Sequence, residues 1–238
     1  MVAIRSLASF SAACLLGVAA LTTHHAEAQS GGGVCVVIDA SRDTLGKQRM
    51  KLLDVVAHVE KLTNGAPYAV MGGLAQILWA RKTHTDDLDL AVATGDLQQA
   101  YRRVRLRAAG SGWTLPRPLA RSHEENDVFE VCHLRFRGSV VDLLSFRDAA
   151  FTAEIVASAR PVAELRDIRF IRPELLLITH LLRPTPAAAL AAVELLLARR
   201  AAADFDEAYA AGWAERLGKK SAFERALARA ADLAGESL

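Results

Sequence analysis

Residues 71–90 read Met-Gly-Gly-Leu-Ala-Gln-Ile-Leu-Trp-Ala-Arg-Lys-Thr-His-Thr-Asp-Asp-Leu-Asp-Leu, and this stretch decides which fold we expect. The pair Gly72-Gly73 opens a short apolar helix, and an apolar run that carries Asp87 and Asp89 follows it. Side chains at positions i and i+2 of a β-strand project from the same face of a sheet. The order therefore predicts a tight backbone turn followed by two carboxylates that face the same way, as the oxygen ligands of a divalent metal must.

The glycine pair and the two aspartates each have a simpler explanation when taken alone. Gly-Gly before a helix is usually a turn, and Asp-x-Asp is often a solvated strand end. Together they favour a phosphate loop beside a metal site, because the N–H groups that begin a helix bind phosphate and glycine lets the phosphate approach closely. Arg81 lies close to this loop and is a candidate for neutralising phosphate charge.

Asp142 is the candidate for a third carboxylate. Residues 128–144 have the pattern of a β-hairpin around Gly138-Ser139, and Asp142 lies on its apolar second strand. A single aspartate in an apolar strand is costly to bury unless it is paired or bound to a metal. We therefore expect Asp142 to complete the metal site and to act as a general base, with a position at a strand edge as the alternative.

Helical and strand patterns alternate along the first two thirds of the chain and give way to helical spacing alone. Helices are expected over 48–62, 72–79 and from Gly95 to 106, and strands over 68–71, 87–93, 128–144 (two strands) and 168–171. We expect an α/β (α+β) fold in which a small mixed sheet with flanking helices spans 47–171. A helical C-terminal part spans 172–238, and an unstructured linker spans 29–46.

The composition is that of an ordinary globular protein, with 238 residues of which 52% are hydrophobic. The formal net charge of +2 provides no bulk attraction to nucleic acid or to a membrane surface. The 3 cysteines are widely spaced and form neither a disulfide framework nor a zinc motif. Composition alone thus excludes nothing beyond these classes, and the function has to come from the motifs.

The first 28 residues have the parts of a secretory signal peptide. Arg5 precedes an apolar stretch over 7–21, and a small-x-small site allows cleavage after Ala28. The apolar stretch is short for a membrane span, so no membrane contact is expected in the mature form. The alternative is that translation starts at Met50, directly before the first clear helix, which would place the protein in the cytoplasm with its nucleoside triphosphates. An exported protein would use the fold for another purpose.

Three segments resemble a known family. They are Tyr68-Ala-Val-Met-Gly-Gly-Leu-Ala, Thr85-x-Asp87-Leu-Asp89 and Val141-Asp142-Leu-Leu. Their order resembles the nucleotidyltransferase superfamily with the polymerase-beta-type core. The residues look more closely like the AbiEii/AbiGii-type nucleotidyltransferases, many of which are toxins in toxin–antitoxin pairs. The resemblance covers residues 50–210.

The resemblance implies a small sheet of the nucleotidyltransferase type, Mg²⁺ or Mn²⁺, and a nucleoside triphosphate donor. By match to the motifs, Gly72 and Gly73 would hold the triphosphate, and Asp87, Asp89 and Asp142 would bind the metal. The implied reaction transfers a nucleoside monophosphate to a hydroxyl of RNA (tRNA included), a protein or a small molecule. An antitoxin is the implied partner.

His180 is a departure from the family pattern. Residues 173–183 resemble a helix that in many members carries a lysine that meets the triphosphate, and His180 stands where that lysine is expected. His180 is therefore either a donor-binding residue or a hydrogen-bonded core histidine, and Arg183 is the candidate substitute. The missing lysine motivates a second hypothesis, a catalytically weak nucleotide-binding protein that acts through partner contacts.

Overall fold

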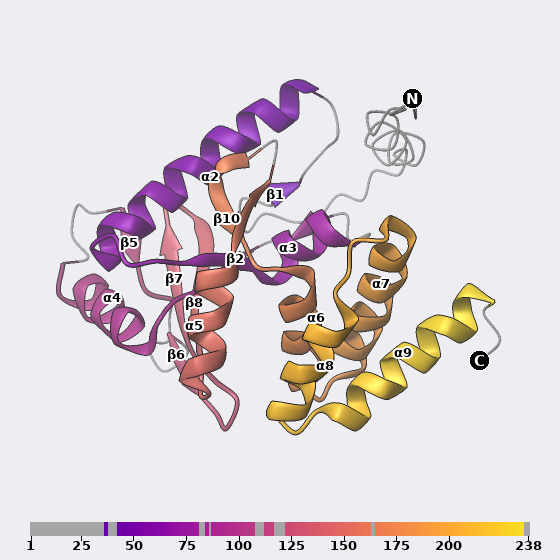
Figure 1. Cartoon of the computed structure of the whole chain (residues 1–238). Coiled ribbons are helices and arrows are strands. Elements are labelled where there is room, and N and C mark those ends of the chain that lie inside the picture. Colours follow the sequence, from indigo (N-terminus) through magenta and orange to yellow (C-terminus); the bar gives the residue numbers. More distant parts are fainter. Residues whose placement is uncertain are drawn as a thin grey trace, which may run out of the picture.

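The computed structural model describes residues 36–37, 42–80, 84–85, 87–107, 112–116, 122–162 and 165–235. These residues form a mixed sheet with helices packed against it and a group of C-terminal helices beside it (Figure 1). The expected signal peptide and Arg81 lie outside the described residues. Within the described ranges, no helix has both the length and the apolar character needed to cross a membrane.

The helices and strands have the following bounds. The helices are α2 (Arg42–Thr63), α3 (Gly72–Trp79), α4 (Thr94–Arg107), α5 (Ala149–Ser158), α6 (Pro173–Leu182), α7 (Pro186–Ala202), α8 (Glu207–Arg216) and α9 (Lys220–Ala234). The strands are β1 (Val36–Val37), β2 (Ala69–Met71), β3 (His84–Thr85), β4 (Asp87–Ala91), β5 (Trp113–Thr114), β6 (His123–Glu125), β7 (Phe129–Phe136), β8 (Ser139–Phe146), β9 (Arg160–Val162) and β10 (Leu165–Phe170).

The main sheet has the strand order β5-β7-β8-β4-β2-β10-β9, and β6 pairs with the outer part of β7. The central pair β4 and β8 is parallel, whereas β2 and β7 run antiparallel to their neighbours β4 and β8. The α/β fold class with a small mixed sheet is thus confirmed. The separate pair β1–β3 joins Val36–Val37 to the segment just before β4.

The central strands alternate between a buried and a partly exposed face, as a half-covered sheet requires. Leu88 and Leu90 of β4 and Val141 and Leu143 of β8 are buried on the face of the sheet where α4 packs against β7 and β8. Each such side chain contributes about 1.5–3 kcal/mol relative to an exposed one. The residues between them in the sequence point to the other face, and these include the aspartates.

Helix α3 connects the sheet to the C-terminal helices. It contacts β4 on one side and α6 and α7 on the other (Figure 1). Helix α6 is buried along nearly its whole length because α3, α7, α8 and α9 surround it, which explains its apolar sequence PELLLITHLL. The start of α3 is therefore held between the two parts of the molecule.

The structure differs from the sequence expectation in the short strands β3, β5 and β6, which were not predicted, and in the following features. The hairpin turn lies at Arg137-Gly138, one residue earlier than expected, because both residues take the positive φ values (49° and 92°) that a two-residue hairpin turn of type I′ needs. Helix α5 and strand β9 were not predicted, although Asp148 caps α5 by accepting a hydrogen bond from the Phe151 N–H. Finally, α2 begins at Arg42 and β1 is paired, so the stretch 29–46 is not wholly unstructured.

Candidate active site

Three aspartates from two parallel strands meet on the exposed face of the sheet. Asp89 of β4 lies directly opposite Asp142 of β8, and Asp87 precedes Asp89 by two residues on the same face. One ligand atom from each of the three residues lies within 4.8 Å of the others. The structure therefore brings together the three candidate metal ligands, and all three are partly buried. Their roles in metal binding and catalysis stay predictions.

Asp87 and Asp89 each accept a hydrogen bond from a group outside β4. The Thr85 hydroxyl donates a hydrogen bond to Asp87 Oδ1 at 2.6 Å, and the Gly73 N–H donates to Asp89 Oδ2 at 3.2 Å. Each bond occupies one lone pair and leaves the other carboxylate oxygen for a further partner. The sequence analysis contains Thr85 only as the first residue of the segment Thr85-x-Asp87-Leu-Asp89, and its hydrogen bond to Asp87 was not predicted.

Gly72 is required where the backbone meets Asp89. A Cβ built on Gly72 would lie 1.7 Å from Asp89 Oδ2, and its φ of +58° is in the left-handed region that glycine favours. Helix α3 begins at this point with no side-chain cap hydrogen bond. The N–H groups of its first turn are thus those that a phosphate could satisfy, and phosphate binding by the pair Gly72-Gly73 stays a prediction.

Asp142 receives its hydrogen bond from a different strand. His133 of β7 is its register partner, and His133 Nδ1 lies 2.9 Å from Asp142 Oδ1. The other ring nitrogen, Nε2, lies 3.6 Å from Oε1 of Glu124 on β6. The pKa of His133 is raised, first by the hydrogen bond to Asp142 and further by the charges of the acidic neighbours, while burial opposes the shift. The sequence analysis did not predict that His133 contacts Asp142.

The three carboxylates repel one another. The pKa of Asp89 is raised from 3.8 to about 7, first because the carboxyl group is buried and then because Asp87 and Asp142 carry like charges. The Gly73 N–H and the positive charge of Arg183 act in the opposite direction. A cation bound between the three groups would remove this repulsion, so the donor set fits a hard divalent metal.

His180 lies in the core and not on the surface of the site. It is buried on α6, and its Nε2 lies 2.9 Å from Gln76 Oε1 on α3, while Gln76 Nε2 donates to the Ala191 carbonyl on α7 at 3.1 Å. These contacts favour a hydrogen-bonded core histidine, and contact with a nucleotide stays a prediction. Arg183, three residues further on, is exposed, and its positive charge acts to lower the pKa of Asp89.

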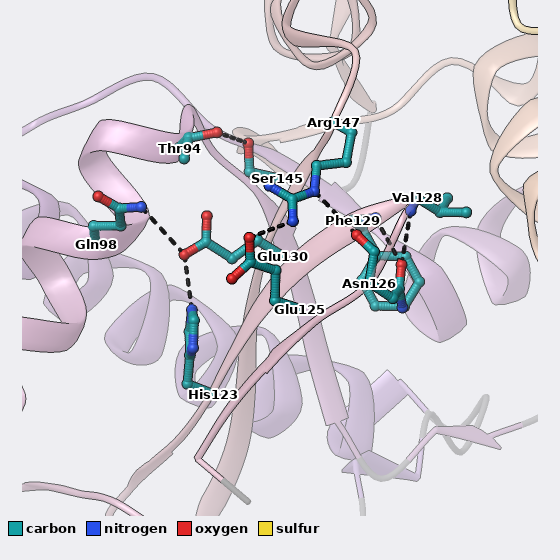
Figure 2. A network of polar contacts seen from close by, with 10 residues as sticks. All are labelled: Thr94, Gln98, His123, Glu125, Asn126, Val128, Phe129, Glu130, Ser145 and Arg147. Atoms are coloured by element: carbon teal, nitrogen blue, oxygen red, sulfur yellow. Dashed lines mark hydrogen bonds and ion pairs between the residues drawn. The ribbon is translucent and has the colours of Figure 1, made fainter. Parts of the chain in front are cut away.

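A second polar cluster, built around a buried glutamate, lies on the opposite face of β7 and β8, and Figure 2 shows its residues. Glu130 of β7 is buried, lies 2.7 Å from His123 Nε2 and accepts a hydrogen bond from Gln98 Nε2 of α4 at 3.4 Å. The hydroxyls of Thr94 and Ser145 are joined at 2.7 Å beside it. We define these five residues as the Glu130 network.

Comparisons with known proteins add a likeness to a solved structure. No family model matches the chain, and no curated protein matches it. Among solved structures, the chain is similar to ANT(2″)-Ia, whose crystal structure contains adenylyl-2″-tobramycin. The sequence identity is 14%, the match covers 77% of this chain and 98% of that chain, and the TM-score is 0.40. The class of this protein is therefore argued from its own residues.

Proposed function

We propose that this protein is a nucleotidyltransferase that transfers a nucleoside monophosphate from a nucleoside triphosphate to a hydroxyl acceptor and releases pyrophosphate. The observation that carries the proposal is the meeting of Asp87, Asp89 and Asp142 beside the start of α3, whose N-cap residue makes no side-chain hydrogen bond. Phosphoryl chemistry needs charge neutralisation and positioning more than covalent help from the protein. A carboxylate cluster next to a helix N-terminus supplies both.

The cluster of Asp87, Asp89 and Asp142 would hold Mg²⁺ or Mn²⁺. Their close approach and the raised pKa of Asp89 support this assignment, because a cation relieves the repulsion among the three groups. When bound, such a metal supplies neutralisation of the phosphate charge.

The protein's own groups account for binding and proton transfer. The N–H groups at Gly72-Gly73 would bind the terminal phosphates of the donor. The acceptor oxygen would attack the α-phosphorus while Asp142 takes the hydroxyl proton. The bond from the α-phosphorus to the bridging oxygen breaks, and pyrophosphate leaves. Arg81 and Arg183 are the proposed cations for the triphosphate, whereas the bond to Gln76 favours His180 as a residue that holds α3.

Labelling with nucleoside triphosphates tests the proposal. The protein is incubated with each of the four α-labelled nucleoside triphosphates, a divalent metal and total cell extract, and labelled acceptor and pyrophosphate are measured. Asp87→Ala and Asp89→Ala should abolish both products. Glu60→Gln, an exposed acid on α2, is the matched control and should leave both unchanged. Equal labelling by the wild type and the two aspartate variants would contradict the proposal.

The second candidate is a nucleotide-binding protein with weak catalysis that acts through partner contacts. The favouring observation is that His180, at the position of the family's lysine, is buried and bonded to Gln76. Calorimetric titration of a nucleoside triphosphate with Mg²⁺ separates the two candidates. Tight binding without pyrophosphate release supports the second, and release supports the first.

The AbiEii/AbiGii-type motifs support an extension of the proposal to a toxin with an RNA, protein or small-molecule acceptor and an antitoxin partner. Growth arrest on expression that Asp87→Ala relieves would support this extension. Mass spectrometry of the mature N-terminus addresses the compartment. A start at Gln29 supports export, whereas a start at Met50 supports a later translation start in the cytoplasm.

A further inference from the structure

The hydrogen bond on Asp142 differs in origin from those on the other two aspartates. Asp87 and Asp89 receive theirs from Thr85 and from the Gly73 backbone, both close to β4. Asp142 receives its bond from the side chain of His133 on the neighbouring strand β7. The bond to Asp142 can thus be changed by substituting a residue outside the carboxylate cluster.

The direction of the His133 bond decides which oxygen of Asp142 is free. An ionised carboxylate only accepts hydrogen bonds, so Nδ1 of His133 carries the hydrogen in the 2.9 Å contact with Oδ1. Oδ1 is thereby occupied by β7. The second oxygen of Asp142 is left for the partners on the β4 side, where Asp87 and Asp89 lie.

His133 has an acidic side chain near each of its ring nitrogens. Register pairing places it opposite Asp142, and Glu124 lies 3.6 Å from its Nε2 on the outer side. The side chain is 27% exposed, so it stands at the edge of the site, between the carboxylates and solvent. A ring held by its strand register and by its hydrogen bond to Asp142 can fix the plane of the carboxylate that it touches.

We propose that His133 is a positioning residue, which orients Asp142 so that one carboxylate oxygen faces Asp87 and Asp89 and binds the divalent metal. The inference rests on the proposed function for its consequence in turnover. Its direct consequence is that loss of the His133 hydrogen bond lowers the metal affinity of the protein in the absence of any nucleotide.

Two amide variants of His133 form a matched pair. The amide of asparagine reaches the position of Nδ1, so His133→Asn keeps a donor for Asp142. The longer glutamine places its amide near Nε2, so His133→Gln directs the donor toward Glu124. His133→Leu removes the donor altogether, and Arg135→Leu is the control, because Arg135 lies on the same face of β7 opposite Val140.

Mn²⁺ binding to the full chain is measured by calorimetry and by electron paramagnetic resonance. His133→Gln and His133→Leu should weaken Mn²⁺ binding about tenfold or more, as loss of an outer-shell hydrogen bond to a ligand does. His133→Asn and Arg135→Leu should stay close to the wild type. In the transfer assay, His133→Gln should lower kcat and leave KM for the nucleoside triphosphate nearly unchanged.

Charge alone predicts the opposite result. A protonated imidazole would repel a cation, so its removal would tighten Mn²⁺ binding. Weaker binding in His133→Gln and His133→Leu therefore reports lost orientation of Asp142. If His133→Leu fails to fold, the comparison of His133→Asn with His133→Gln still tests the orientation of Asp142. Thermal unfolding checks that both of these variants are folded.

Three results would overturn the inference: His133→Gln binding Mn²⁺ as tightly as the wild type, His133→Asn weakening binding as much as His133→Gln, or a wild-type protein that binds no Mn²⁺. A wild-type protein that binds Mn²⁺ but releases no pyrophosphate refutes the proposed function instead. In that case the Mn²⁺ measurements on the variants still decide the role of His133.

Discussion

The carboxylates on the two faces of the central sheet differ in how many hydrogen-bond donors and like charges surround them. On one face, Glu130 is paired with Ser145 across β7 and β8, lies under α4 and has donors from Gln98 and His123. On the other face, Asp142 occupies the corresponding position three residues earlier on β8 and meets two further carboxylates. Strands β7 and β8 thus contribute residues to both clusters.

The difference lies in how many donors the protein supplies for each negative charge. The Glu130 network contains one carboxylate with donors from two side chains, so the chain itself satisfies the group. The aspartate cluster contains three carboxylates, for each of which we describe one protein donor, and their repulsion raises the pKa of Asp89. A fully satisfied network stabilises the fold, whereas an undersatisfied anionic cluster is suited to binding a cation.

The largest expected effect is on catalysis by the aspartate cluster. Asp89→Asn keeps the shape of the side chain and an acceptor for the Gly73 N–H but removes one charge. Nucleotidyl transfer should fall about 10²–10³-fold or more, since metal-borne charge stabilisation contributes several kcal/mol. The free energy of unfolding in urea should not fall, because repulsion is relieved. A loss of stability without a loss of transfer would mean that the aspartate cluster stabilises the fold and does not catalyse transfer.

The next effect is the pH dependence of stability. The folded protein keeps the Asp89 proton up to about pH 7, whereas the unfolded chain releases it near 3.8. The folded state therefore binds more protons between these values, and the free energy of unfolding should fall with rising pH there, by at most about 4 kcal/mol.

Asp89→Asn should lack this part of the pH profile, and the difference between the two profiles isolates it from the titration of His133. Saturating Mg²⁺ should also flatten the wild-type profile, because a bound cation favours the ionised carboxylates. Parallel profiles for the wild type and Asp89→Asn, measured by urea unfolding across this range, would argue against a raised pKa at Asp89.

Disruption of the Glu130 network should affect stability and not chemistry. Glu130→Ala leaves the Gln98 amide and the His123 ring without their buried acceptor, so the free energy of unfolding should fall by about 1–3 kcal/mol. Mn²⁺ affinity should be unchanged in the folded protein. Chemical denaturation and calorimetry measure the two quantities, and weaker Mn²⁺ binding would show that the two faces are coupled.

The smallest effect is expected at the rim of the same network. Glu125 pairs with Arg147 in Figure 2, and both side chains are about half exposed. Surface ion pairs contribute little, so Glu125→Gln should change the free energy of unfolding by less than about 1 kcal/mol. Denaturation measured beside Glu130→Ala provides the comparison, and equal losses would mean that burial does not distinguish the two glutamates.

Local patterns in the sequence were sufficient for the main elements and for the aspartates. Apolar spacing predicted α2, α3, α4 and the strands β2, β4, β7, β8 and β10, and the i, i+2 spacing predicted that Asp87 and Asp89 face the same way. These features depend on neighbours in the chain. The mixed sheet follows because the strand patterns are separated by helical ones.

The register of the hairpin decided what the sequence analysis missed. A turn at Gly138-Ser139 would place Arg135 opposite Asp142, whereas the observed turn places His133 there. The shift arises because Arg137 adopts a positive φ, a conformation that is uncommon for arginine and therefore not expected from the sequence. One residue at the turn thus moved the partner of Asp142 by two positions along the same face of β7.

Long-range contacts were the other limit. His180 bonds to Gln76, which is 104 residues away in the sequence, so its helix could be predicted but not its partner. The capping aspartate of α5 was a local signal and could have been found. Sequence patterns therefore identified which residue types could form the site, and packing decided which of them meet.

The contact between the start of α3 and Asp89 has a consequence for the order of binding. The Gly73 N–H that a phosphate would use is already bonded to Asp89 Oδ2, and the Asp89 carboxylate fills the space that a side chain at Gly72 would occupy. One amide cannot serve both anions at full strength. A cation that draws the carboxylate away releases the amide, so metal and triphosphate should each raise the affinity of the other by the same factor, as reciprocal linkage requires.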